Sequence, residues 1–188
     1  MGALSFAKLA ALAYGAVLAV GLTVVLVRSP HPITPGYDVT EGCSPDDLAH
    51  YCRGVRARVS SYDVFANHHP LFAIDGRGSH EPLEKWASSG GDAEPWIELL
   101  FPAPVDFSAV RLLQAGEFEP AEYNMRSYRL TCSAGDELVA ELAVEGNEAS
   151  APMHALSCRA VDRLLIRYDI EPGTGRDVAR LYEIEVRP

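Results

Sequence analysis

From residue 61 to the C-terminus, the chain consists of short apolar runs, alternating or β-branched, that end at Gly, Pro, Asp or Asn. Such alternation turns one face of a strand inward, and turn residues at this spacing separate successive strands. A helix over 137–146 is also compatible with propensity, but turn residues flank that segment on both sides. The pattern therefore predicts an all-β antiparallel sandwich or barrel. The strand candidates are residues 96–101, 108–115, 128–134, 137–146, 163–170 and 179–187.

The beginning of the chain has a different pattern. Leu9 to Val27 is a run of 19 residues without a charge. At about 1.5 Å per residue, a helix of this length is roughly 28 Å long, enough to cross the hydrocarbon core of a bilayer. A cleaved secretory signal is the alternative, although its apolar region would be shorter, about 7–15 residues. We expect residues 1–28 to be an uncleaved anchor that forms one transmembrane helix.

Small residues recur at every fourth position in this segment. On a helix they would form one stripe, against which another transmembrane helix could pack closely. The alternative is a general bias of the chain toward alanine. Other transmembrane subunits are therefore one class of partner that the sequence allows. The helix-packing candidates are Ala7, Ala11, Gly15 and Ala19.

Residues 29–60 read as a linker, because their prolines and glycines interrupt both helices and strands. One short helix is expected within it, in the sequence SPDDLAHYC. Ser44 would cap this helix, Pro45 would occupy its first position, and two aspartates would lie in its first turn.

Four cysteines are present, at positions 43, 52, 132 and 158. Their even number and their spacing suggest two disulfides, Cys43 with Cys52 and Cys132 with Cys158, in an oxidising compartment. Four free thiols are the alternative, and no zinc-binding spacing is present. Flanking charges orient the anchor only weakly. We therefore expect a single-pass membrane protein whose domain lies in the periplasm or outside the cell.

The charge and the missing motifs exclude several functions. With 16 basic against 26 acidic residues, the chain has a formal net charge of −10, which disfavours nucleic acid as a partner. The sequence contains no GxSxG, HExxH or P-loop motif, and no GxGxxG that opens a helix. We expect the protein not to be an enzyme.

Several stretches in a fixed order resemble a known family. They are residues 73–113, 128–138, 144–147, 163–169 and 179–186. Together they are similar to the discoidin or coagulation-factor type C (F5/8 type C) domains. These domains belong to the galactose-binding-like β-sandwiches, or jelly rolls, which include many bacterial carbohydrate-binding modules. The resemblance implies such a sandwich over residues 61–188, with Trp86 and Trp96 in its core.

Members of that family often hold a structural calcium ion between an acidic DG turn and the closing strand. Asp75 and Glu183 occupy the matching positions, and calcium prefers oxygen ligands of this kind. The residues before Trp86 depart from the family pattern, so Ser79 and Glu84 are candidate replacement ligands. The alternative is that Asp75 caps its own turn and Glu183 lies on a solvated strand face.

The resemblance also implies a ligand site on loops at one end of the sandwich. The loops to consider are 65–72, 76–84, 116–126 and 150–157. Their aromatic and polar side chains suit either a glycan or a protein ligand. The candidates are Phe65, His68, His69, Arg77, His80, Phe118, Tyr123, Asn124, Arg126 and His154.

Taken together, these features predict a membrane-anchored, non-catalytic extracytoplasmic binding module that recognises a glycan or a protein. The alternative is a structural accessory subunit that docks onto a membrane complex through its helix and its sandwich. The absence of a catalytic domain favours this alternative, whereas the family resemblance favours the binding module.

Overall fold

The structure is a computed structural model of the whole chain, and it describes residues 43–78 and 84–188. These residues form an antiparallel β domain without an α-helix, as expected. Four short 3-10 turns, η1 to η4, join the strands at Tyr51–Arg53, Pro70–Ala73, Ala115–Glu117 and Ala121–Tyr123. The strands are β1 Arg56–Val59, β2 Trp86–Ala87, β3 Trp96–Gln114, β4 Tyr128–Ala134, β5 Glu137–Val144, β6 Met153–Tyr168 and β7 Arg180–Arg187.

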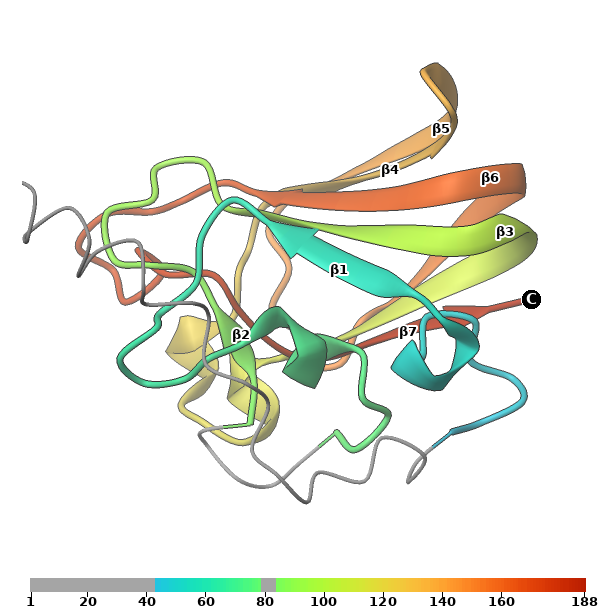
Figure 1. Cartoon of the computed structure of the whole chain (residues 1–188). Helices are drawn as coiled ribbons and strands as arrows, with labels where there is room; N and C mark the ends of the chain where they lie inside the picture. The colour runs from blue at the N-terminus through green and yellow to red at the C-terminus, as the bar shows by residue number, and fades with distance from the viewer. Residues whose placement is uncertain (1–42, 79–83) are drawn as a thin grey trace, which may run out of the picture. The chain divides into compact units, whose positions relative to one another are not determined.

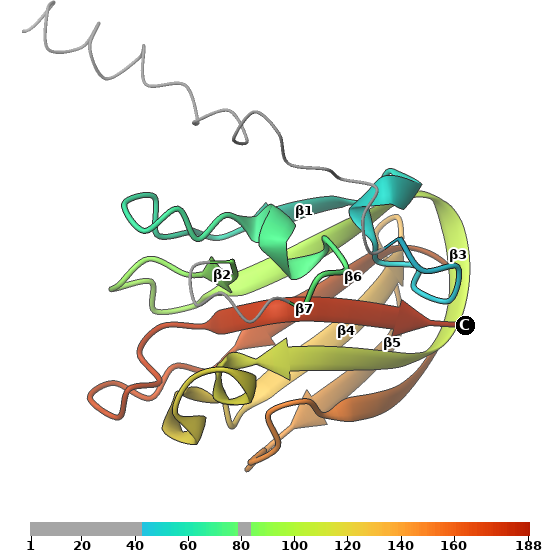
Figure 2. The ribbon, with the colours of Figure 1, turned by 90° about the horizontal axis from the view of Figure 1, so that it is seen from below.

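The two layers of the sandwich share their longest strands. The strand order is β2-β7-β3-β6-β4-β5, with β1 also paired to β3. The first half of β3 pairs with β1 and with the end of β6, where Trp96 lies opposite Arg167. Its second half pairs with β7 and with the start of β6, where Arg111 lies opposite Met153. Figures 1 and 2 show β3 and β6 folding over from one layer into the other.

The fold-over explains how the expected strands differ from those observed. The segments 96–101 and 108–115 are two halves of β3, joined by register shifts between Leu100 and Ala109. Bulges of this kind bend a strand, and the prolines in this stretch cannot donate a ladder hydrogen bond. Likewise, the expected strand 163–170 corresponds to the second half of β6, which begins ten residues earlier at Met153. A local apolar pattern ends at the bend, although the strand continues through it.

Aromatic rings and a disulfide fill the core. Trp86 is fully buried, and its ring lies 6.2 Å from that of Tyr168, which in turn packs 5.5 Å from Tyr128. Both predicted disulfides are present. The buried Cys132–Cys158 bond joins β4 to the bend of β6, with an S–S distance of 2.06 Å. Trp96 is only partly buried, at the start of β3.

Residues 47–59, expected to belong to a linker, pack against the sandwich. Ala49 and Val55 are part of the hydrophobic core, and β1 completes one layer. The expected helix capped by Ser44 is not formed. Ser44 instead accepts a hydrogen bond from the backbone of Asp46 in a turn, and only η1 follows, capped by His50. Side chains of this segment bond the backbone locally, which competes with a helix.

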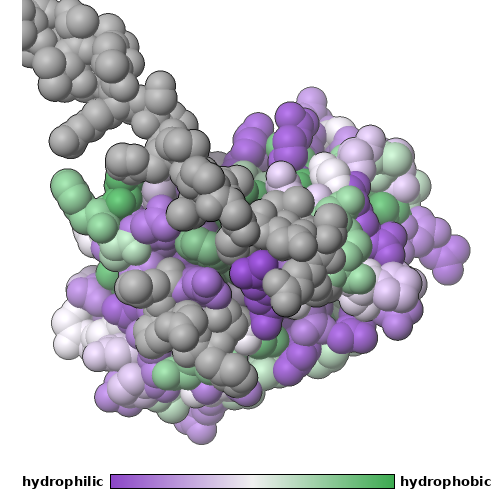
Figure 3. Space-filling view, turned by 60° about the horizontal axis from the view of Figure 1, so that its bottom comes forward, coloured by the Kyte–Doolittle hydropathy of each residue, from purple (hydrophilic) through white to green (hydrophobic). Residues whose placement is uncertain are grey.

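Within residues 43–78 and 84–188, no helix is long and apolar enough to cross a membrane. The expected anchor 1–28, the first part of the linker and the stripe of Ala7, Ala11, Gly15 and Ala19 lie outside the described residues. On the face that Figure 3 shows, the described residues form small groups of hydrophilic and hydrophobic side chains.

Candidate functional site

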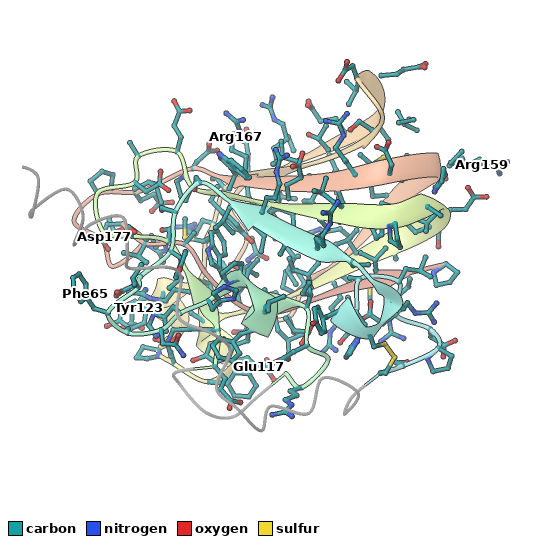
Figure 4. All side chains as sticks on the ribbon, in the orientation of Figure 1. Phe65, Glu117, Tyr123, Arg159, Arg167 and Asp177 are labelled. Atoms are coloured by element: carbon teal, nitrogen blue, oxygen red, sulfur yellow. A yellow bond between two sulfur atoms is a disulfide. The ribbon has the colours of Figure 1, made fainter. Side chains whose placement is uncertain are left out.

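The loops that join the strands gather at one end of the sandwich, here called the loop end. It comprises residues 60–69, 88–95, 115–127, 145–152 and 169–179. In Figure 1 these connections lie on the left, whereas the bends of β3 and β6 lie on the right. Figure 4 shows Phe65, Tyr123 and Asp177 at the loop end and Arg159 at the opposite end. Three separate loops therefore present side chains to the same region.

Asn124 holds three of these loops together. Its side chain is 1% exposed. Its Oδ1 accepts a hydrogen bond of 2.7 Å from the backbone N–H of Gly116, and its Nδ2 donates to Ser150 Oγ at 3.1 Å. Arg176 Nε donates to the carbonyl of Asn124 at 3.0 Å. The polar groups of this predicted ligand residue are thus occupied by the neighbouring loops.

A pocket of about 350 Å³ opens beside this junction, here called the loop-end pocket. Arg126 and Glu148 face each other across it at 3.7 Å, with 42% and 86% of their side chains exposed. A pair this exposed contributes little stability, so both groups are accessible to a ligand. The residues lining the pocket are Ala121, Glu122, Asn124, Arg126, Asn147, Glu148 and Arg176.

The aromatic residues of the loop end differ in accessibility. The Phe118 ring packs 4.6 Å from that of Tyr182, and the Arg180 guanidinium lies 4.4 Å from the Tyr123 ring centroid. Phe65, in contrast, is 100% exposed. Asp63 braces its loop by accepting hydrogen bonds from the backbone N–H groups of Phe65 and Ala66. Phe65 therefore projects into solvent from a supported turn.

The two adjacent histidines of this region have different surroundings. His69 Nδ1 accepts a hydrogen bond from the backbone of Leu71 at 3.2 Å. The ring nitrogens of His68 are buried and have no hydrogen-bond partner among the described residues. Burial, and then the charge of Lys85, lowers the pKa of His68, and burial lowers that of His69. Both rings are therefore biased toward the neutral form.

Lys85 belongs to a compact polar cluster beneath these loops. Its ammonium group donates to Glu119 at 2.6 Å, and the Tyr182 hydroxyl donates to the same carboxylate at 2.9 Å. Lys85 is buried, and burial followed by the interaction with Glu119 raises the pKa of Tyr182. Partnered charges of this kind fix the loop that follows β3 against β7.

The sequence predicted His154 in a loop, and this prediction is wrong. It is within β6, and its Nε2 is hydrogen-bonded to the Tyr128 hydroxyl at 2.8 Å. Burial lowers its pKa. The loop expected over 150–157 ends before Met153, where the first half of β6 begins. His80 lies outside the described residues.

A second pocket, here called the carboxylate pocket, lies on the outer face of β3 and β7 and measures about 310 Å³. Glu183 projects into it from β7 and is only 2% exposed. Its Oε2 accepts a 3.4 Å hydrogen bond from the backbone of Gly78, whereas its Oε1 has no partner among the described residues. The pocket is lined by Ser44, Asp47, Gly76, Arg77, Gly78, Arg111, Leu113, Glu183, Glu185 and Arg187.

Glu183 lies beside the carboxyl group of Asp75. Burial, followed by the negative charges of Asp75 and Asp47, raises the pKa of Glu183 well above its ordinary value. Asp75 also caps its own turn by accepting from the backbone N–H of Arg77 at 3.0 Å. A solvated position for Glu183 is thus contradicted, while the capping role of Asp75 is confirmed.

These observations fit a hard cation. Two adjoining buried carboxyl groups repel each other when both are ionised, although a hydrogen bond joins them when one is protonated, and Glu183 Oε1 is available to a metal ion. Three arginines also line the pocket, and two of them, Arg111 and Arg187, are paired with Glu185. Glu84 does not line this pocket, and Ser79 lies outside the described residues. Cys43, His50 and Cys52 also lie within 4.8 Å of one another, but the two sulfurs form a disulfide and are not available as thiolate ligands.

No family model and no curated protein matches the sequence. Solved structures do match. A fucose-binding module from Streptococcus pneumoniae is 16% identical, with a TM-score of 0.61 over 76% of this chain and 97% of that chain. The lectin domain of lectinolysin, solved in complex with Lewis B antigen, is 14% identical, with a TM-score of 0.63 over 77% and 97%.

The family 32 carbohydrate-binding module from C. perfringens NanJ, solved with galactose, is 16% identical, with a TM-score of 0.57 over 76% of this chain and 98% of that chain. All three are discoidin-type, galactose-binding-like sandwiches. The described domain therefore has the fold of the discoidin-type carbohydrate-binding modules, as the resemblance in the sequence implied.

Proposed function

We propose that the protein is a membrane-anchored, non-catalytic module that binds a glycan outside the cytoplasm through its loop end. The observation that carries this proposal is the pairing of a polar pocket with a projecting aromatic ring at the same end of the sandwich. Sugar sites combine a flat apolar plate with fixed hydrogen-bonding groups. Proteins of the same fold have been solved with Lewis B antigen and with galactose.

Each part of the loop end has a role in this proposal. Phe65 offers its exposed face to the apolar side of a sugar ring. Arg126 and Glu148 supply a donor and an acceptor for hydroxyl groups. Asn124 positions these groups without touching the glycan, because its own polar atoms are already bonded. Exposed loops of this kind set ligand choice on a rigid scaffold.

A structural calcium ion in the carboxylate pocket is part of the same proposal. Asp75 and Glu183 would hold it, with oxygen atoms as its ligands. When bound, the ion would neutralise the adjoining carboxylates and fix the DG turn against β7. We place this role in stability and not in ligand contact, because none of the residues that line this pocket belongs to the loop end.

The proposed location rests on two features of the sequence. The uncharged segment from Leu9 to Val27 is long enough to span a bilayer. Two disulfides in the domain are typical of an oxidising compartment. The anchor would therefore hold the sandwich on the periplasmic or extracellular side.

A glycan array probed with the full-length chain in mild detergent tests the binding function. We expect saturable binding that falls at least tenfold in Phe65→Ala and in Arg126→Ala. Arg159→Ala is the matched control, since it removes an exposed arginine at the opposite end. Binding that is equal in all three variants would reject the loop end as the site.

The accessory-subunit alternative predicts a different result from the same preparation. A stoichiometric membrane partner would copurify with the wild type and with Arg126→Ala. It would be lost in Gly15→Leu, because the larger side chain interrupts the small-residue stripe and keeps another helix from packing closely. That outcome, together with an array that shows no binding, would replace the glycan-binding proposal.

A further inference from the structure

A short segment joins the two elements that carry the buried carboxyl pair. Residues 43–55, here called the clasp, lie along the edge of β7 that does not pair with β3. The backbone N–H of Leu48 donates to the carbonyl of Val186 at 2.8 Å, and Val186 donates back to Asp47 Oδ1 at 2.9 Å. Asp47 is itself buried and also accepts from the backbone of Ala49. The clasp therefore extends the pairing of β7 only three residues from Glu183.

The same segment also holds the DG turn. The backbone N–H of Tyr51 donates to the carbonyl of Ile74 at 2.8 Å. His50, which is 1% exposed, lies with its Nε2 at 2.7 Å from the carbonyl of Asp75. Because His50 Nδ1 accepts the N–H of Cys52 at 2.9 Å, Nε2 is the nitrogen that donates to Asp75. The turn that presents the Asp75 carboxyl group is thus bonded at two consecutive carbonyls.

A disulfide closes the clasp around these contacts. Cys43 and Cys52 lie nine residues apart and enclose Asp47, Leu48, His50 and Tyr51. A closed loop has fewer open conformations than a free segment, so contacts within it are made more often. Ser44 and Asp47 of the clasp also line the carboxylate pocket. One stapled segment is therefore bonded to both sides of that pocket.

We propose that the clasp is a positioning element of the cation site: it sets the separation of Asp75 and Glu183 and thereby the affinity for calcium. Asp47 and His50 act as positioning residues, one on β7 and the other on the DG turn. Neither needs to ligate the ion. This inference rests on the cation part of the proposed function and is independent of the glycan part.

Calcium titration of the full-length chain in mild detergent, followed by isothermal calorimetry, tests the clasp. We expect Asp47→Ala, His50→Ala and the double variant Cys43→Ser/Cys52→Ser each to weaken calcium binding about 10- to 100-fold, the usual loss when a group that orients a ligand is removed. Asp46→Ala is the matched control, because it removes a neighbouring carboxylate that is exposed on the same segment. It should change the affinity less than twofold.

The conservative variant Asp47→Asn separates positioning from charge. An amide oxygen still accepts from Val186 and Ala49, so the calcium affinity should return to within about threefold of the wild type. Near-ultraviolet circular dichroism identifies any variant that fails to fold, and the remaining variants then decide the result. Wild-type affinity in folded His50→Ala and in the cysteine variant would overturn the clasp proposal. Absence of calcium binding in the wild type would overturn both the clasp and the cation site, while leaving glycan binding on the array unaffected.

Discussion

The carboxylate pocket lies on the outer face of two paired strands, whereas the loop-end pocket is assembled entirely from connections between strands. In the first, ladder hydrogen bonds place Glu183 beside Leu113 and Glu185 beside Arg111. In the second, the side chain of Asn124 joins loops that are distant in sequence. Paired strands leave little freedom for buried charges, while a side-chain junction can be altered one loop at a time. The difference suggests a fixed structural role for one pocket and an adjustable recognition role for the other.

The largest effect is expected from removing what both pockets share, the Cys132–Cys158 bond in the core. The disulfide closes a loop of 26 residues, so its loss in Cys132→Ala/Cys158→Ala should lower the free energy of unfolding by about 3.5 kcal/mol. Guanidinium denaturation measures this. Calcium and glycan binding should weaken together as the folded population falls. Loss of binding at one pocket only, in protein that is still folded, would contradict a shared scaffold.

The next prediction is that calcium stabilises the protein through the carboxylate pocket and not through the loop-end pocket. At a free concentration 100 times its Kd, a ligand bound only to the folded state stabilises by about 2.7 kcal/mol. For a domain of this size, each kcal/mol raises Tm by roughly 2–4 °C. We expect this shift in the wild type and in Arg126→Ala, and not in Glu183→Gln. Differential scanning fluorimetry with and without a chelator measures it, and an equal shift in Glu183→Gln would place the ion elsewhere.

A single methyl group tests the loop-end junction. A Cβ added at Gly116 would lie 2.6 Å from Asn124 Nδ2 and from Ser150 Oγ. Gly116→Ala should therefore cost about 1–3 kcal/mol of stability and weaken glycan binding, without changing calcium affinity. Gly90→Ala is the control, because nothing lies within 4 Å of its added Cβ. Equal effects in both variants would show that Asn124 does not organise the loops.

The same contrast explains what could be predicted from the sequence. Glu183 and Asp75 come together as the resemblance implied, and it was the family pattern, not a local signal, that related two positions so far apart in the sequence. Only the second half of the continuous strand β6 was predicted as a strand, because its apolar pattern changes face at the bend near Cys158. Local reading therefore placed His154 in a loop. Asn124 was a ligand candidate by residue type, and nothing in its neighbourhood indicates that Gly116 and Ser150 occupy its side chain.

The complete exposure of Phe65 at the loop end could not be predicted from its residue type. Phe65 is one apolar residue in a short segment, and its complete exposure depends on the turn that Asp63 braces.

The clasp was missed for a similar reason. Its proline and adjacent aspartates suggested a capped helix in a linker, whereas long-range bonds from Leu48 and Tyr51 to β7 and the DG turn decide its structure. Contacts between segments far apart in sequence leave no periodic signal.

The last effect expected is a pH dependence that arises at the carboxylate pocket. Burial raises the pKa of Glu183 in the folded, metal-free protein above its unfolded value. Below about pH 4.5 the group is protonated in both states and costs nothing. As the pH rises above that value, the unfolded chain releases the proton first. It then binds fewer protons than the folded chain, so the free energy of unfolding falls until the pH passes the folded pKa.

Partly buried histidines oppose this trend, which is why the prediction is a difference between two proteins. The pKa values of His68, His69 and His154 are lowered by burial, so their contribution to stability rises with pH up to about 6.5. It is the same in wild type and Glu183→Gln, and it cancels when one curve is subtracted from the other. In chelator, we expect Glu183→Gln to gain stability over the wild type as the pH rises from 5 to 8, by about 1.4 kcal/mol for each pH unit that lies between the unfolded and the folded pKa of Glu183. Urea denaturation at several pH values measures this gain, and saturating calcium should reverse it. A difference that stays constant with pH would mean that Glu183 is not held beside Asp75 in a dry pocket, and it would remove the electrostatic contrast between the two pockets.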